Sequence, residues 1–128
     1  MHENNFQKLA KLIKRAYAPY SHFKVAALVE TDKGIFVGVN VENASFSLSL
    51  CAERVAITNA ITNGAKKFKS LYLLSSKLQM DVTPCGACRQ VIFEFCPRHM
   101  PIYVYNKIGK VKKYLVSQLL PQGFKLKK

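Results

Sequence analysis

Residues 84–89 read Pro84-Cys85-Gly86-Ala87-Cys88-Arg89, and residues 51–54 read Cys51-Ala52-Glu53-Arg54. Each segment is predicted to open a helix, over residues 86–95 and 51–63 respectively. Cys85 and Cys88 are three residues apart, so they lie on one helical face and can bind a single metal ion. A helix N-terminus lowers the pKa of a thiol, because its free N–H groups and its dipole stabilise the anion. If the two N-termini face each other, three thiolates are available for zinc.

The fourth cysteine, Cys96, is predicted to be a buried apolar residue and not a further ligand. In an unbroken helix it lies eight residues beyond Cys88, which is about 12 Å along the axis. Zinc–sulfur bonds are about 2.3 Å long, so one ion cannot reach both sulfurs. Three protein ligands leave a fourth position for water, which is typical of a catalytic zinc site.

Charged residues lie directly beside these cysteines. Glu53 is predicted to move protons at the open zinc position; the alternative is an acidic residue that only complements the helix dipole. Three thiolates make the zinc centre negative, which calls for a nearby cation. We expect Arg54, Arg89 or both to donate hydrogen bonds to the ligand sulfurs. The alternative is two surface arginines.

Helices and strands are predicted to alternate along the rest of the chain. A first helix over residues 5–15 carries apolar residues at helical spacing and ends before Pro19. Strands are expected over residues 23–29, 35–41, 68–75, 102–106 and 110–115, with a helical turn over 116–120. This order favours an α/β fold in which helices cover both faces of a mixed five-stranded sheet, in one catalytic domain of residues 1–128.

Composition and charge narrow the function class. No apolar run is long enough to span a bilayer, and Met1–Gln7 lacks the apolar core of a signal peptide, so we expect a cytoplasmic protein with no membrane partner. There, four cysteines favour a metal site or a redox pair over disulfides. The net charge of +13 allows nucleic-acid binding, but the lysines are dispersed. Dispersed charge favours a solvated surface with no specific nucleic-acid partner.

In combination, these motifs resemble those of the zinc-dependent nucleobase deaminases. Cys51 stands where the polynucleotide and tRNA adenosine deaminases have His, and this variant is typical of the small homotetrameric cytidine deaminases. Further agreeing stretches are Ala16-Tyr17-Ala18-Pro19-Tyr20-Ser21, Asn40-Val41-Glu42-Asn43-Ala44-Ser45-Phe46 and Cys85-Gly86-Ala87-Cys88-Arg89-Gln90-Val91. The resemblance runs from the first helix to Leu119-Leu120-Pro121 and covers nearly the whole chain.

The resemblance implies a three-layer α/β/α fold and a reaction. Cys51, Cys85 and Cys88 would bind one zinc ion per subunit. The implied reaction hydrolyses free cytidine and deoxycytidine to uridine and deoxyuridine plus ammonia, as in pyrimidine salvage. Glu53 would be the general acid and base, taking a proton from the attacking water and protonating N3 and then the leaving amine.

The resemblance also implies substrate contacts. Asn40 and Glu42 would hydrogen-bond the ribose hydroxyls, and Phe23 would pack on the pyrimidine. The backbone N–H of Ala52 would donate to O2 of the base, and the carbonyl of Thr83 would accept from the amine. The residues by themselves would pass for ordinary loop, strand and core positions.

Three features concern the neighbouring subunits or depart from the family pattern. Phe124, in the C-terminal tail, resembles the aromatic residue that covers the base bound in a neighbouring subunit of the homotetramer. Between Phe23 and Leu28 the chain has one small residue fewer than is usual in the family, which affects strand register and the orientation of Phe23. Phe46 replaces a frequent Tyr.

Other functions stay open on the sequence. A deaminase of polynucleotides or of a modified cytosine nucleoside would use the positive charge, but the carboxylate of Glu42 would repel a phosphate at the sugar. A structural zinc module or a basic nucleic-acid-binding domain would not need Glu53. A thiol redox protein would also give Glu53 no task.

Overall fold

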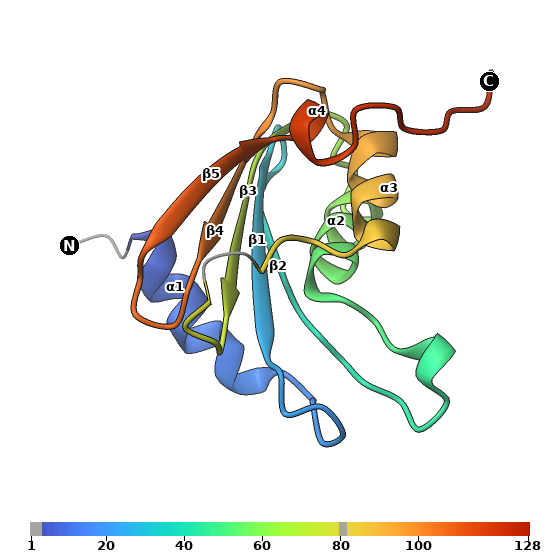
Figure 1. Ribbon diagram of the computed structural model, residues 1–128. Coiled ribbons are helices and arrows are strands. Elements are labelled where there is room, and N and C mark those ends of the chain that lie inside the picture. The colour runs from blue at the N-terminus through green and yellow to red at the C-terminus, as the bar shows by residue number, and fades with distance from the viewer. Residues whose placement is uncertain (1–3, 80–81) are drawn as a thin grey trace.

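A mixed five-stranded sheet forms the middle layer of the structure, a computed structural model that describes residues 4–79 and 82–128 (Figure 1). The strands are β1 (Val25–Thr31), β2 (Gly34–Val39), β3 (Phe68–Ser75), β4 (Pro101–Tyr105) and β5 (Val111–Leu115). They lie in the order β2-β1-β3-β4-β5. The β3–β4 pair is parallel and the other neighbouring pairs are antiparallel, so the sheet is mixed, as predicted.

Helices cover both faces of this sheet, which confirms the predicted three-layer fold. On one face lie α1 (Asn5–Leu12) and the 3₁₀ turn that follows it (Ile13–Arg15). On the other face lie α2 (Ala52–Thr62), α3 (Gly86–Phe95) and α4 (Val116–Leu119) (Figure 1). Among the residues that the structure describes, no helix has the length and apolar character needed to cross a bilayer.

The central strand β1 contributes to the core on each side of the sheet. Ala26 and Leu28 pack with Leu9 of α1, whereas Ala27 and Val29 belong to the larger core under α2 and α3. Successive side chains of a strand point to opposite faces. A strand covered on both faces therefore has a continuous apolar run instead of an alternating one.

Two strand ends beside Asn40 differ from the prediction: β1 begins at Val25 instead of residue 23, and β2 ends at Val39 instead of residue 41. The side-chain oxygen of Asn40 accepts from the Val25 N–H at 2.9 Å, and its side-chain nitrogen donates to the Phe23 carbonyl at 2.7 Å. The Asn40 N–H still donates to the Val25 carbonyl at 3.2 Å, but the Val25 N–H pairs with the Asn40 side chain instead of its backbone carbonyl, so regular pairing of the ladder ends here. Phe23 is therefore outside the strand.

The missing small residue between Phe23 and Leu28 leaves no irregularity at the start of β1. Pairing between β1 and β3 is continuous from Val25–Ser75 to Glu30–Ser70, and the register shifts only between Glu30 and Thr31. A bulge is one extra residue in one strand. The shorter segment here is consistent with a regular strand in place of a bulged one.

Gly38 sets how closely α2 approaches the sheet, and we predict that Gly38→Ala destabilises the fold. An added Cβ would lie 2.5 Å from the Ala56 nitrogen and 2.7 Å from the Ala52 oxygen, both backbone atoms of α2. Relief requires the helix to move, and overpacking of this kind costs about 1–3 kcal/mol or more. Thermal unfolding should show a lower midpoint. Gly86→Ala, where a Cβ meets nothing within 4 Å, is the control; equal midpoints for the two variants would contradict the prediction.

Candidate metal centre and substrate cavity

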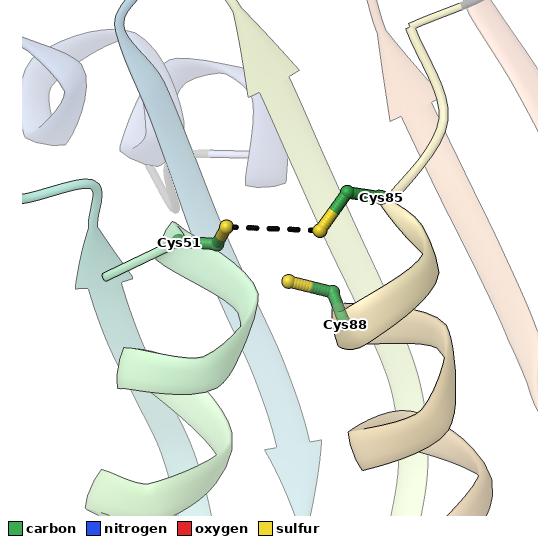
Figure 2. A group of neighbouring side chains, drawn as sticks. All are labelled: Cys51, Cys85 and Cys88. Atoms are coloured by element: carbon green, nitrogen blue, oxygen red, sulfur yellow. Dashed lines mark hydrogen bonds between the residues drawn. The ribbon is translucent and has the colours of Figure 1, made fainter. Parts of the chain in front are cut away.

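The N-termini of α2 and α3 converge above the sheet, and each is preceded by a cysteine (Figure 2). Cys51 is the N-cap residue of α2 and Cys85 that of α3, both with extended backbone, and neither side chain makes a capping hydrogen bond. Cys88 lies in the first turn of α3 and points toward the same space (Figure 2). The predicted start of α3 is therefore correct, and α2 begins one residue after its predicted start at Cys51. The two helix starts bring three sulfurs together.

The spacing of the sulfurs fits one zinc ion. The Sγ atoms of Cys51 and Cys85 are 3.9 Å apart, and those of all three cysteines lie within 4.8 Å of one another. Four tetrahedral ligands at about 2.3 Å from zinc are separated by about 3.8 Å. Three cysteine sulfurs are a donor set that zinc accepts, and they leave one position for another ligand.

Protonation differs among these cysteines. A hydrogen bond from the Cys88 thiol, assisted by one from Arg54, lowers the pKa of Cys51 from 9.0 to about 5. The same hydrogen bond to Cys51, together with burial, raises the pKa of Cys88. One thiolate is thus already stabilised without metal, and a metal that takes up all three sulfurs would displace the remaining protons.

Cys96 lies away from this cluster, as predicted. It follows the last residue of α3 and is buried in the larger hydrophobic core. Burial raises the pKa of its thiol to about 12. A neutral, buried thiol is an inert apolar residue.

The two arginines beside the ligands have different partners. Arg54 Nη2 donates to Cys51 Sγ at 3.7 Å and to the Ser49 carbonyl at 3.1 Å, so the expected bond to a sulfur is present here. The expectation for Arg89 is corrected, because its donors go to Thr83 Oγ1 and to two backbone carbonyls instead. Each helical residue is rotated by about 100° from the one before it. A residue directly after Cys88 therefore points to a different side of the helix.

Glu53 lies in the first turn of α2 and is only 6% exposed. Burial is the main reason that the pKa of its carboxyl rises from 4.5 to about 7, and the neighbouring Cys51 adds to the rise. A carboxyl with a pKa near neutrality can both accept and return a proton. This environment suits proton transfer better than a simple dipole contact.

A cavity of about 320 Å³ is lined by Cys51, Cys85 and Glu53, whereas the buried Cys88 is not among its wall residues. Its volume lies in the range of small-molecule sites. The sequence-predicted residues in its wall are Phe23, Asn40, Glu42, Cys51, Ala52, Glu53, Thr83 and Cys85. Its wall also contains apolar residues from β3 and β4, among them Leu73 and Val104. The structure thus brings nearly all predicted substrate positions to one cavity.

Ser21 was not predicted, and it connects two of the predicted positions. Its hydroxyl donates to the carboxylate of Glu42 and accepts from the Phe23 N–H at 3.0 Å. The same carboxylate accepts from the N–H groups of Tyr20 and Ser21 at 3.0 and 3.1 Å. The bond from Ser21 is the main reason that the pKa of Glu42 is lowered. The signal in the sequence was the position of Ser21 at the end of the stretch Ala16-Tyr17-Ala18-Pro19-Tyr20-Ser21, which agrees with the family pattern.

Phe124 is absent from the wall of the cavity and is 66% exposed. Gln90 holds this part of the tail on α3: its side chain donates to the Phe124 carbonyl at 2.7 Å and accepts from the Phe124 N–H at 3.3 Å. The ring therefore does not cover the cavity of its own chain. Its assignment to a neighbouring subunit stays a prediction.

Several known proteins are similar to this chain in sequence and in fold. The family described as "Cytidine and deoxycytidylate deaminase zinc-binding region" matches residues 1–104. A cytidine deaminase of Sporosarcina psychrophila is 44% identical over 115 residues, covering 89% of this chain and 84% of the relative. One from Mycoplasma genitalium is 36% identical over 119 residues, covering 93% and 92%. The crystal structure of cytidine deaminase from Burkholderia pseudomallei superimposes with a TM-score of 0.87 at 35% identity, covering 95% of this chain and all of that one. The chain belongs to the cytidine and deoxycytidylate deaminase family.

Proposed function

We propose that this chain hydrolyses the C4 amine of free cytidine and deoxycytidine, giving uridine or deoxyuridine and ammonia. One observation carries the proposal: three sulfurs spaced for zinc lie together, and two of their residues, Cys51 and Cys85, line a cavity with Glu53, a buried carboxyl whose pKa lies near 7. Zinc, when bound to Cys51, Cys85 and Cys88, supplies a Lewis acid that activates water for attack. The described residues around this cavity form one sheet with its helices, which supports a single catalytic domain.

Glu53 moves the protons in this proposal. It takes one proton from the attacking water and gives it to N3 of the base, then takes the second proton from the hydroxyl now on C4 and gives it to the departing amine. Ala52 is the first residue of α2, and the first N–H groups of a helix have no partner within it. Its N–H is therefore suited to donate to O2 of the base. The carbonyl of Thr83, another residue of the cavity wall, would accept from the amine.

Asn40 and Glu42 would bind the sugar. After its two bonds to the backbone of Phe23 and Val25, the Asn40 amide retains one N–H and one acceptor site for a ribose hydroxyl. Glu42 stays charged and accepts hydroxyl donors, but it would repel a phosphate. Phe23, released from β1, would pack on the pyrimidine. This set favours a free nucleoside over a polynucleotide.

The assay is conversion of cytidine by the zinc-loaded protein, followed as formation of uridine and release of ammonia. Cytidine and deoxycytidine should be converted, and a cytosine-containing oligonucleotide should react at a much lower kcat/KM. Faster reaction of the oligonucleotide would support the polynucleotide alternative. Absence of reaction with all three substrates, in protein that contains stoichiometric zinc, would overturn the proposed function.

We further propose a cytoplasmic homotetramer in which Phe124 covers the base bound by a neighbour. The exposed ring, held on α3 by Gln90, supports this. So do the exposed side chains of Phe46 and Leu48, which are typical of an interface. Three thiols within 4.8 Å call for a reducing compartment. Sedimentation analysis should give four times the mass of one chain; a fully active monomer would refute the shared site.

A further inference from the structure

The side chain of Arg89 reaches three acceptors from two separate segments of the chain. Nε donates to the Pro84 carbonyl at 2.7 Å, and Nη2 donates to Thr83 Oγ1 at 2.7 Å. Nη1 donates to the carbonyl of Leu119, the last residue of α4, at 3.0 Å. The planar guanidinium thus binds the segment before α3 on one side and the end of α4 on the other. Lysine has no such rigid fork of donors.

The segment that Arg89 holds has no regular structure of its own. Residues 82–85 are neither helix nor strand. Within the described part of the chain, the hydrogen bonds that reach Thr83 and Pro84 both come from Arg89. Both residues line the cavity beside Cys85. Among the described residues, Arg89 is therefore the side chain that hydrogen-bonds the cavity wall at this point.

Arg89 also has a fixed relation to the metal ligands. It directly follows Cys88 in the first turn of α3, so one rigid turn carries a ligand sulfur on one side and the guanidinium on another. The C-terminal carbonyls of a helix lack partners within it, and a charged donor to the Leu119 carbonyl stabilises that end of α4. The distance between the ligand sulfurs and the wall is set through this turn.

We propose that Arg89 is a positioning residue, which holds the Thr83–Pro84 backbone so that the Thr83 carbonyl faces the amine of the substrate. The inference rests on the proposed function, in which that carbonyl is the amine acceptor. A correctly placed Thr83 carbonyl accepts a hydrogen bond from the amine of cytidine. It repels the C4 oxygen of uridine, because the carbonyl oxygen and the C4 oxygen are both acceptors. Arg89 therefore determines how strongly the cavity prefers substrate over product.

The test compares Arg89→Gln with the unmodified zinc-loaded protein in two measurements: the kinetics of cytidine deamination and the inhibition constant of uridine as a competitive product. Loss of one oriented hydrogen bond should raise KM for cytidine about tenfold. The inhibition constant of uridine should stay the same or fall, and the zinc content should not change. Arg89→Lys, which retains the charge but not the fork, should recover only part of the preference.

Arg98→Gln is the matched control. Arg98 donates to the Pro121 carbonyl at 3.3 Å and lies over the Phe93 ring, so it contacts the same tail and α3 but not residues 82–85. This variant should leave the ratio of KM to the uridine inhibition constant unchanged. If Arg89→Gln does not fold, Thr83→Val removes one of the three acceptors alone and should shift the same ratio in the same direction.

Two failures can be told apart. An unmodified, zinc-loaded protein that does not deaminate cytidine overturns the proposed function. An active protein in which Arg89→Gln and Thr83→Val change both constants in parallel, or leave both unchanged, overturns the role of Arg89 alone. Loss of zinc from Arg89→Gln in step with its loss of activity would also overturn it, because the residue would then act through the metal site.

Discussion

Glu53→Gln should nearly abolish deamination while the protein still folds and binds zinc. Glutamine has the size and shape of glutamate, but it cannot accept a proton and return it. Glu53 is buried beside the three sulfurs and makes no bond to the metal in the proposed arrangement. General acid–base catalysis contributes about 10²–10⁴-fold, so kcat should fall by at least that factor. An amide in place of a carboxylate should also leave the thiolates free for metal.

The measurement is kcat for cytidine, with the zinc content of the same sample determined by elemental analysis. Glu94→Gln is the control, because Glu94 lies at the surface of α3 and its ion pair with Lys128 is exposed. The same chemical change there should leave kcat and zinc content unaltered. A Glu53→Gln variant that keeps more than a tenth of the activity would show that the residue only complements the helix dipole.

The helix starts could be predicted because their signals are local. Cys85 and Cys88 follow Pro84 at a spacing that a helix places on one face, and the placement of Cys96 followed from helix length alone. Convergence of the two N-termini is different, since it depends on the packing of α2 and α3 on the same face of the sheet. The residues alone were compatible with this convergence, and the prediction that all three cysteines bind one zinc ion came from the family resemblance.

Side chains that replace backbone pairing could not be predicted from local pattern. Asn40 ends two strands by bonding to Phe23 and Val25, which are 17 and 15 residues away in sequence. Ser21 likewise hydrogen-bonds to Glu42, which is 21 residues away in sequence. Nothing in the composition of a polar loop reports such a contact. The prediction that Arg89 donates to a ligand sulfur was wrong for a geometric reason: because Arg89 directly follows Cys88 in sequence, it lies on another side of the helix.

Cys85→Ala should lose the zinc site, whereas Cys96→Ala should keep it. Each change replaces a thiol-bearing side chain by a methyl group, but the two positions differ. The sulfur of Cys85 belongs to the metal-binding cluster, and the sulfur of Cys96 belongs to the hydrophobic core. Loss of a ligand leaves two sulfurs, and it should weaken zinc binding by more than the roughly 10–100-fold that loss of an outer partner costs. Since Cys85 is exposed, its replacement removes little core packing. Cys96→Ala leaves a small cavity that costs about 1 kcal/mol, with no effect on the metal.

Thermal unfolding with and without a chelator separates these effects, because a metal that binds only the folded chain raises its unfolding midpoint. Adding the chelator should lower the unfolding midpoint of the unmodified protein and of Cys96→Ala by the same amount. Without the chelator, the midpoint of Cys96→Ala should already be lower than that of the unmodified protein. Cys85→Ala should not respond, since it has no tightly bound zinc to lose, and it should not deaminate cytidine. A Cys96→Ala protein without stoichiometric zinc would mean a closed four-cysteine site. Such a site has no open position for water, so the same result would remove the chemical basis of the proposed activity.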